Sequence, residues 1–222
     1  MAALISLALV VLFVVMIIPG CKSAETILSC TNFAASGGET VLFGNSEDGG
    51  ISHPLKKDPL IAHLFFYPAT ENEFGAVFVG WLWQGEAGSI QGGMNDRGLS
   101  YDLTGIPDTE MANHPDKPYR RHRDWVLYEV LRKNATVKEV IVYLSDVNWE
   151  GHVWFQWFFA DASGDMVIVS PDRDGELAFT RKPAGTDGFM TQTNFNRANP
   201  KSHDGPYPCP RYEVSEPRRR FL

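Results

Sequence analysis

Basic residues are scarce in this chain of 222 residues, which has 20 Lys and Arg against 27 Asp and Glu and a net charge of −7. Proteins that bind nucleic acid present a basic face to the phosphates, so this balance argues against a nucleic-acid partner. A basic cluster, Arg218–Arg220, lies close to the last residue, and a short charge run of this kind is typical of a solvated tail.

Patterns that bind metals or phosphates are also missing. No HxxxH motif occurs, and the six histidines are scattered at His53, His63, His114, His122, His152 and His203. The glycine pairs in "SGGE" and "IQGGM" lack the lysine and the strand-to-helix context that a phosphate-binding loop needs. We therefore expect no metal and no cofactor.

The first twenty residues read as an export signal. Residues 2–18 carry no charge and are almost wholly apolar, and Pro19 and Gly20 end the run. We expect residues 1–20 to be a signal peptide or a membrane anchor, although the usual Lys or Arg at the start is missing. The segment "IPGC" resembles a bacterial lipoprotein cleavage box, which makes Cys21 a candidate for lipidation. The protein would then be periplasmic, extracellular or membrane-anchored, with this anchor as its only membrane contact.

The rest of the chain predicts strands, then two helices, then strands again. Apolar and aromatic runs bounded by Pro, Gly or polar turns predict strands around residues 40–43, 60–69 and 75–85, and on either side of two turns, Asn95–Gly98 and Asp161–Asp165. Helical spacing predicts a helix over residues 122–133, and Thr136 with Glu139 forms a capping-box pattern that begins another. No repeat or linker divides the chain, so we expect one α+β domain with helices packed on antiparallel sheets.

Two further expectations concern packing and the end of the chain. We expect the aromatic cluster Trp154, Phe155, Trp157, Phe158 and Phe159 to be buried in a sheet. The Pro-rich segment after residue 196 closes without an obvious final element, so a C-terminal part of the domain is expected to be missing from this chain.

Cys30 raises a chemical question because it follows the export signal so closely. Export permits disulfides, but three cysteines cannot all pair within the chain. A Cys30–Cys209 disulfide is one reading, and a nucleophile is the other. If the chain were cut just before Cys30, the freed α-amine would have a pKa of about 8 and could act as the base for the neighbouring thiol. Such a site also needs a carboxylate to hold the amine and donors for an oxyanion.

Four segments together resemble a known superfamily. They are "CTNF…VLFGNSEDG", "QGGMNDRGLSYD", "WFFADASGDMVIVSP" and "TQTNFN", in that order along the chain. They resemble the N-terminal-nucleophile cysteine hydrolases of linear amides, which include choloylglycine hydrolases, penicillin V acylases, acid-ceramidase-like amidases and relatives of isopenicillin-N acyltransferase. The resemblance covers residues 30 to about 212 and implies a four-layer αββα sandwich of two antiparallel sheets.

The resemblance also implies roles for single residues. Cys30 matches the nucleophile, Asp48 the carboxylate that binds its α-amine, and Asn194 the asparagine that donates to the oxyanion. Residues 21–29 would then be a propeptide removed by a cut between Ser29 and Cys30. Taken alone, Asp48 reads as a turn residue or helix cap and Asn194 as a loop asparagine.

Three further positions are possible members of the site. Many relatives have an arginine that helps to polarise the thiol where this chain has Asn45, and this departure puts nucleophile activation in question. Asn95 matches a motif position that favours turn formation near the pocket. Arg211 is the candidate for a late arginine that relatives place near the active site.

The expected function is hydrolysis of a linear, non-peptide amide through an acyl-enzyme on Cys30. Two alternatives stay open, namely acyl transfer to an amine acceptor and a non-catalytic, membrane-tethered binding protein on the same fold. The expected partner is a small-molecule amide. Neither the particular substrate nor the oligomeric state can be deduced from these residues.

Overall fold

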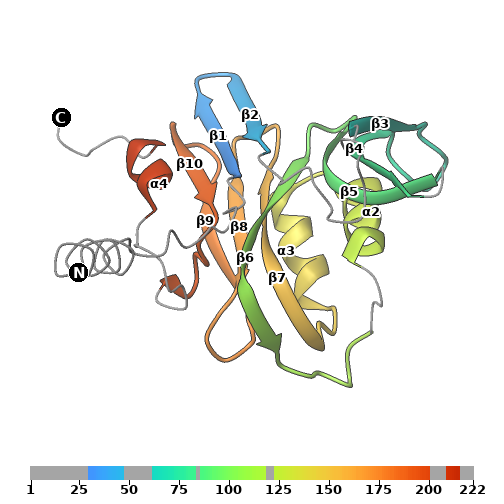
Figure 1. The fold of residues 1–222 in the computed structure, drawn as a ribbon. Coiled ribbons are helices and arrows are strands. Elements are labelled where there is room, and N and C mark those ends of the chain that lie inside the picture. Colours follow the sequence, from blue (N-terminus) through green and yellow to red (C-terminus); the bar gives the residue numbers. More distant parts are fainter. Residues whose placement is uncertain (1–29, 48–61, 84–85, 119–122, 201–208, 216–222) are drawn as a thin grey trace, which may run out of the picture.

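The computed structural model describes residues 30–47, 62–83, 86–118, 123–200 and 209–215, and these form two antiparallel sheets with helices on both sides (Figure 1). The predicted leader, the propeptide with Cys21 and Ser29, and Asp48 all lie outside the described residues. Within the described residues, no helix combines the length and the apolar character needed to cross a membrane.

The small sheet has the order β10-β1-β2, so the first strand of the domain lies in its middle. Strand β1 (Thr31–Gly37) pairs with β2 (Thr40–Ser46) through a tight hairpin and with β10 (Gly188–Thr193) on its other side. Gly38 has a φ of 58° in the hairpin turn, a conformation that glycine adopts without strain. The sequence predicted β2 but not β1, whose segment "TNFAASG" is rich in Ala, Ser and Gly.

The large sheet is a seven-stranded antiparallel meander whose strands follow one another in chain order. They are β3 (Ala62–Tyr67), β4 (Ala76–Trp83), β5 (Glu86–Asn95), β6 (Ser100–Met111), β7 (Gly151–Ala160), β8 (Met166–Pro171) and β9 (Leu177–Lys182). Both predicted turns are present, since Gly98 donates its N–H to Asn95 O at 3.1 Å and Gly164 donates to Asp161 O at 3.0 Å. The strands expected around these turns are therefore confirmed.

Helices α2 (Arg123–Lys133) and α3 (Val137–Ser145) cover the outer face of the large sheet (Figure 1). The predicted capping box is formed, because Glu139 N–H donates to Thr136 Oγ1 at 3.2 Å and Thr136 N–H donates to Glu139 Oε2 at 3.0 Å. The main core lies between these helices and the sheet, where the largest fully buried side chains include Leu127, Leu131, Leu144, Tyr101, Trp157 and Phe159.

A second, smaller core joins the two sheets. It consists of side chains on the facing strands β1, β7, β8 and β10, namely Ala34, Phe158, Ala160, Met166, Ile168 and Met190, with Phe43 of β2 at its edge. Helix α4 (Pro210–Ser215) lies beside β10, on the opposite side of the molecule from α2 and α3 (Figure 1). The order helix, sheet, sheet, helix confirms the layered fold that the resemblance implied.

Two details differ from the sequence-based expectations. Trp154 is 56% exposed, whereas the four other aromatic residues of its cluster on β7 are buried as predicted. It shares a strand face with Phe158 but lies nearer the start of β7, beyond the small core. Helix α4 was not predicted; the Tyr212 ring holds it by packing edge-on against Phe195, with ring centroids 5.0 Å apart.

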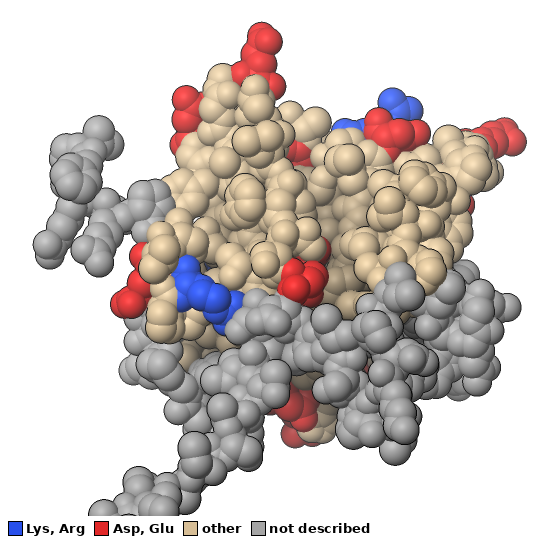
Figure 2. Space-filling model, turned by 45° about the horizontal axis from the view of Figure 1, so that its top comes forward, with Lys and Arg blue, Asp and Glu red and all other residues tan. Residues whose placement is uncertain are grey.

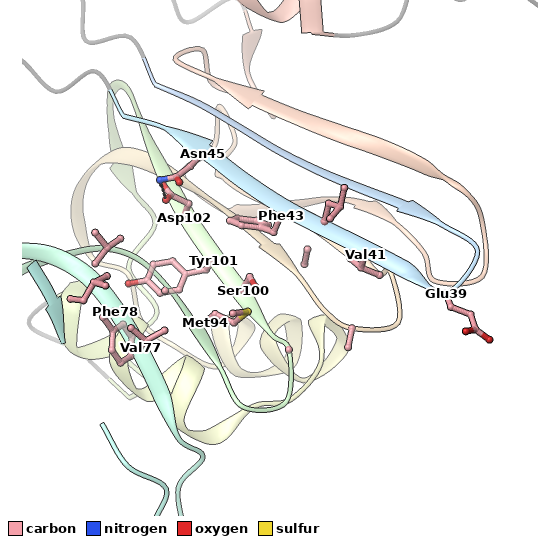
Figure 3. A pocket seen from close by; sticks show the side chains of 17 residues that line it. Glu39, Val41, Phe43, Asn45, Val77, Phe78, Met94, Ser100, Tyr101 and Asp102 are labelled. Atoms are coloured by element: carbon pink, nitrogen blue, oxygen red, sulfur yellow. Dashed lines mark hydrogen bonds between the residues drawn. The ribbon is translucent and has the colours of Figure 1, made fainter. Parts of the chain in front are cut away.

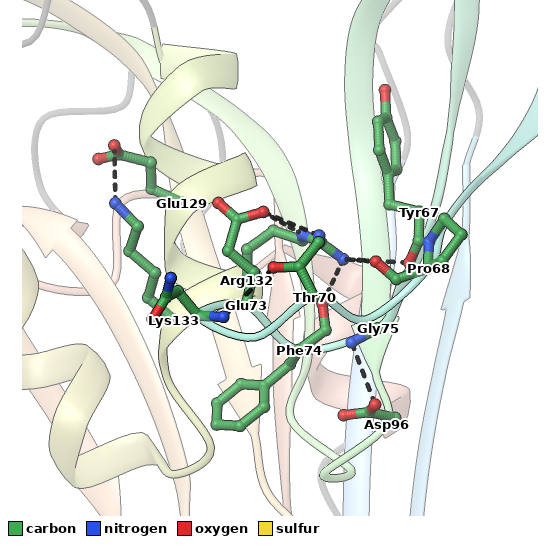
Figure 4. Close-up of polar contacts among 11 residues, drawn as sticks. Tyr67, Pro68, Thr70, Glu73, Phe74, Gly75, Asp96, Glu129, Arg132 and Lys133 are labelled. Atoms are coloured by element: carbon green, nitrogen blue, oxygen red, sulfur yellow. Dashed lines mark hydrogen bonds and ion pairs between the residues drawn. The ribbon is translucent and has the colours of Figure 1, made fainter.

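Arg132 joins α2 to the connection between β3 and β4 (Figure 4). The arginine is 2% exposed, and its guanidinium donates to the Glu73 carboxylate at 2.8 Å and to Pro68 O at 2.9 Å, as well as to the carbonyls of Tyr67 and Phe74. Because these acceptors belong to the last residue of β3 and to the loop that follows it, this buried charge fixes the loop against the helix.

The face turned forward in Figure 2 is mostly neutral, with acidic groups scattered over it and few basic ones. This distribution agrees with the acidic balance of the sequence.

Candidate functional site

Cys30 directly precedes β1 and is 6% exposed, so the protein buries this thiol at the end of the small sheet. Neither Cys30 nor Cys209 takes part in a disulfide. The alternative of a Cys30–Cys209 bridge is therefore wrong, and the Cys209 thiol instead lies 2.9 Å from Thr193 Oγ1.

Two side chains from the other end of the chain contact the backbone of Cys30. Its N–H donates to Asn194 Oδ1 at 2.7 Å, and its carbonyl accepts from Arg211 Nη1 at 2.6 Å. Arg211 Nη2 also donates to Asn194 Oδ1, at 3.2 Å, so one guanidinium holds both residues. These contacts exist because β10 pairs with β1 and delivers Asn194 beside Cys30, while α4 places Arg211 over both.

The amide of Asn194 is engaged at its nitrogen as well. Nδ2 donates to the carbonyl of Gly105 in β6 at 3.0 Å. A carboxamide nitrogen carries two N–H groups, so one remains for a ligand after this bond.

The side chain of Cys30 contacts a carboxylate that the sequence reasoning did not single out. The thiol lies 3.2 Å from Glu47 Oε2, in position to donate to it. The same oxygen accepts from Gln91 Nε2 at 3.0 Å, and Gln91 is held in turn by Leu103 O at 3.2 Å. Glu47 itself is exposed to solvent, while Gln91 is buried.

A buried polar cluster lies beneath these residues, centred on Asp102 of β6. Its carboxylate accepts from Asn45 Nδ2 at 2.6 Å, from Asn32 Nδ2 at 3.3 Å and from the Leu103 N–H at 2.6 Å. Asp102 is only 2% exposed. Burial, together with the negative charge of Glu47 and a hydrogen bond to it, raises the pKa of the Asp102 carboxyl well above its usual range.

A groove of about 650 Å³ runs from this cluster along β2 (Figure 3). One wall carries Val41, Phe43 and Asn45, which share a face of β2 because side chains alternate along a strand. The opposite wall comes from β4, β5 and β6, with Phe78 and Met94 among its residues. The groove is predominantly apolar, and Asn45 and Asp102 provide polar groups at one end.

The structure thus brings Cys30, Asn194 and Arg211 together, although they are far apart in the sequence. Asn45 contacts Asp102. Asn95 lies in the β5–β6 turn: its Oδ1 accepts from two backbone N–H groups there, and its Nδ2 donates to two carbonyls at the end of α2. These contacts support the turn-forming role for Asn95.

Glu47 could have been found from strand periodicity. Residues 41, 43 and 45 face the large sheet, so residue 47 continues the same row. The register pairs Thr31 with Ser46, the last residue of β2. This register places the following residue, Glu47, beside Cys30. Gln91 and Asp102 are the first and last residues of the motif "QGGMNDRGLSYD", but their contacts with Glu47 and Asn45 could not be predicted, because they come from the other sheet.

No cluster of three or more His, Cys, Asp or Glu that could bind a metal occurs among the described residues.

No protein-family model and no curated protein matches this sequence, but solved structures do match the fold. Two variants of the conjugated bile acid hydrolase from Clostridium perfringens superpose with TM-scores of 0.52 and 0.53 at 17% identity, over 69% of this chain and 51% of theirs. Penicillin V acylase from Agrobacterium tumefaciens superposes with a TM-score of 0.52 at 22% identity, over 72% of this chain and 52% of its own.

These likenesses show that the chain shares the fold of a conjugated bile acid hydrolase and of a penicillin V acylase, two of the kinds of protein whose motifs it resembles. The chain spans about half the length of the structures it matches.

Proposed function

We propose that this protein hydrolyses a linear, non-peptide amide, with the Cys30 thiol as nucleophile at the start of the mature chain. The observation that carries this proposal is the convergence of Asn194, Arg211 and Glu47 on the nitrogen, the carbonyl and the thiol of this one cysteine. The solved structures with the same fold are amide hydrolases, which supports the same class of reaction.

The reaction would begin with attack of Cys30 Sγ on the amide carbonyl carbon. The second N–H of Asn194 Nδ2 would stabilise the oxyanion, since the first is bound to Gly105 O. The α-amine of Cys30 would take the thiol proton and deliver it to the leaving amine. Water would then attack the thioester, give up a proton to the same amine, and release the acid.

Each neighbouring residue would have a defined task. Arg211 holds the Cys30 carbonyl and Asn194 in one arrangement, so the nucleophile and the oxyanion donor keep a constant separation. Asp48 is proposed, from the resemblance alone, to bind the α-amine.

The test is a panel of N-acyl amines and N-acyl amino acids with the purified protein. Cys30→Ala should abolish hydrolysis, while Cys209→Ser, which keeps a hydrogen-bonding group beside Thr193, should retain it. A fully active Cys30→Ala variant would overturn the proposal. Adding amines to the assay separates hydrolysis from acyl transfer, because the same acyl-enzyme would then yield a new amide.

One observation favours a non-catalytic binding protein as the second candidate. Asn45 stands where relatives carry a thiol-polarising arginine, and it contacts Asp102. If Cys30 in the folded protein does not react with iodoacetamide and no panel member is hydrolysed, this second function replaces the first.

Maturation and location complete the proposal. Residues 1–20 would direct export, Cys21 would carry a lipid, and removal of residues 21–29 would expose the amine of Cys30. The partner would be a small-molecule amide, with membrane contact only through the N-terminal anchor. Intact-mass and N-terminal analysis of the expressed protein tests this order of events, and an active protein that still begins at or before Cys21 would contradict it.

A further inference from the structure

The amine that serves as base in the proposed reaction does not exist before the chain is cut. Until then the nitrogen of Cys30 is an amide, and the structure shows its N–H donating to Asn194 Oδ1 at 2.7 Å. An amide nitrogen cannot accept the thiol proton, yet a thiol attacks a carbonyl effectively only as thiolate. Self-cleavage before Cys30 therefore requires a different base.

Glu47 is in the right place for that task. Its Oε2 lies 3.2 Å from Cys30 Sγ, within the reach that proton transfer needs. Gln91 Nε2, itself tied to Leu103 O, donates to the same oxygen at 3.0 Å and fixes its position. Glu47 is exposed to solvent, whereas Cys30 beside it is buried.

The charges around the thiol favour Glu47 as the proton acceptor over its neighbour. Asp102 is the other carboxyl of the cluster, and its burial and the charge of Glu47 favour its protonated form. A carboxyl in its protonated form cannot accept the thiol proton, and it is Glu47 that lies within 3.2 Å of Cys30 Sγ. Arg211, the cation at the site, contacts the Cys30 carbonyl and Asn194 Oδ1.

We propose that Glu47 is the general base that drives self-cleavage between Ser29 and Cys30, which rests on the proposed function of Cys30 as a nucleophile. The thiol proton moves to Glu47 as Sγ attacks the Ser29 carbonyl carbon. The C–N bond then breaks, Glu47 passes the proton to the Cys30 nitrogen, and Ser29 is left as a thioester on Sγ. Water hydrolyses the thioester to the Ser29 carboxylic acid and restores the thiol.

The experiment follows self-cleavage of the full chain by intact mass over time. Glu47→Gln keeps the size of the side chain but removes its basicity, and we expect cleavage about 100-fold slower than in the unsubstituted protein, within the usual contribution of a general base. Glu47→Asp restores a carboxylate and should cleave at an intermediate rate. Glu39→Gln is the matched control, since Glu39 lies in the turn before β2, at the opposite end of that strand from Glu47 (Figure 3), and it should cleave at the unsubstituted rate.

Two readouts separate this proposal from a structural effect and from the proposed function. Unfolding midpoints of all variants show whether Glu47→Gln is folded. If it is not, the Glu47→Asp rate decides: an intermediate rate supports the carboxylate as base, and an unchanged rate, despite the shorter reach of aspartate, overturns it. A second set of proteins carries a site-specific protease sequence in place of residues 21–29, so that added protease exposes Cys30. Amide hydrolysis by this protease-cut protein tests the proposed function without any self-cleavage.

Each outcome decides one of the two proposals. Self-cleavage of folded Glu47→Gln at the unsubstituted rate, or a full chain that never cleaves itself, overturns the role of Glu47. Protease-cut protein that hydrolyses no amide overturns the proposed function, even if self-cleavage depends on Glu47.

Discussion

Replacement of Arg211 tests whether the hydrogen bonds from its guanidinium to Cys30 and Asn194 position the nucleophile. Nη1 donates to the Cys30 carbonyl at 2.6 Å and Nη2 donates to Asn194 Oδ1 at 3.2 Å. Hydrogen bonds from a charged group contribute about 1.5–3 kcal/mol each, and the partial burial of Arg211 favours the lower value. Arg211→Ala therefore removes about 3 kcal/mol of positioning, which corresponds to roughly a 100-fold loss of kcat.

The lysine variant sharpens this prediction. Arg211→Lys keeps the charge but has a single ammonium in place of the planar fork, so it can satisfy only one of the two acceptors well. We expect it to lose about tenfold in kcat, half of the alanine effect on a free-energy scale. KM should change much less, because neither acceptor belongs to the substrate.

The assay is steady-state hydrolysis of the best panel amide, with the alkylation rate of Cys30 as an independent readout. Arg173→Ala is the control, because Arg173 lies on an exposed turn with its side chain 82% accessible. If Arg211→Ala keeps more than half of the unsubstituted kcat while remaining folded, the positioning role is refuted.

Three further predictions concern stability. Burial and Glu47 raise the pKa of Asp102 in the folded state, so above pH about 4 the folded protein binds more protons than the unfolded chain and its stability should fall as the pH rises. Asp102→Asn should flatten this slope in denaturant titrations between pH about 4 and about 8, and an unchanged slope would contradict the assignment. Arg132→Ala leaves a buried cluster of acceptors without its donor and should lower the unfolding free energy by about 3–5 kcal/mol. A loss below about 1 kcal/mol would show that the loop between β3 and β4 repacks at little cost. Thr136→Ala breaks the capping box with Glu139 and should cost about 1 kcal/mol by the same titration, and no measurable change would mean that tertiary contacts alone hold α3.

Much of the fold could be predicted because its signals are local. Thr136 and Glu139 lie within one turn of each other, so their pairing requires no knowledge of the rest of the chain. The turn at Asn95–Gly98 follows from residue types that favour tight turns, and Asn95 supplies the hydrogen bonds itself. Strands β7 and β8, beside the turn at Asp161–Asp165, are largely apolar and aromatic, as strand propensity favours.

Strand β1 and helix α4 lacked such signals. The β1 segment consists largely of small residues with low strand propensity, and its position between β2 and β10 makes it a strand through backbone hydrogen bonds on both edges. Helix α4 has six residues, too short to be stable alone, and is retained because Tyr212 packs against Phe195.

The sequence by itself determined the candidates Cys30, Asn194 and Arg211, because residue types in ordered motifs carry a family's chemistry. The tertiary structure decided which groups surround the thiol. Glu47 lies beside Cys30 through the register of a hairpin, whereas Gln91 and Asp102 come from the second sheet, packed against the first. Contacts between sheets depend on how two distant segments stack, and no local pattern in either segment records which residues will face each other.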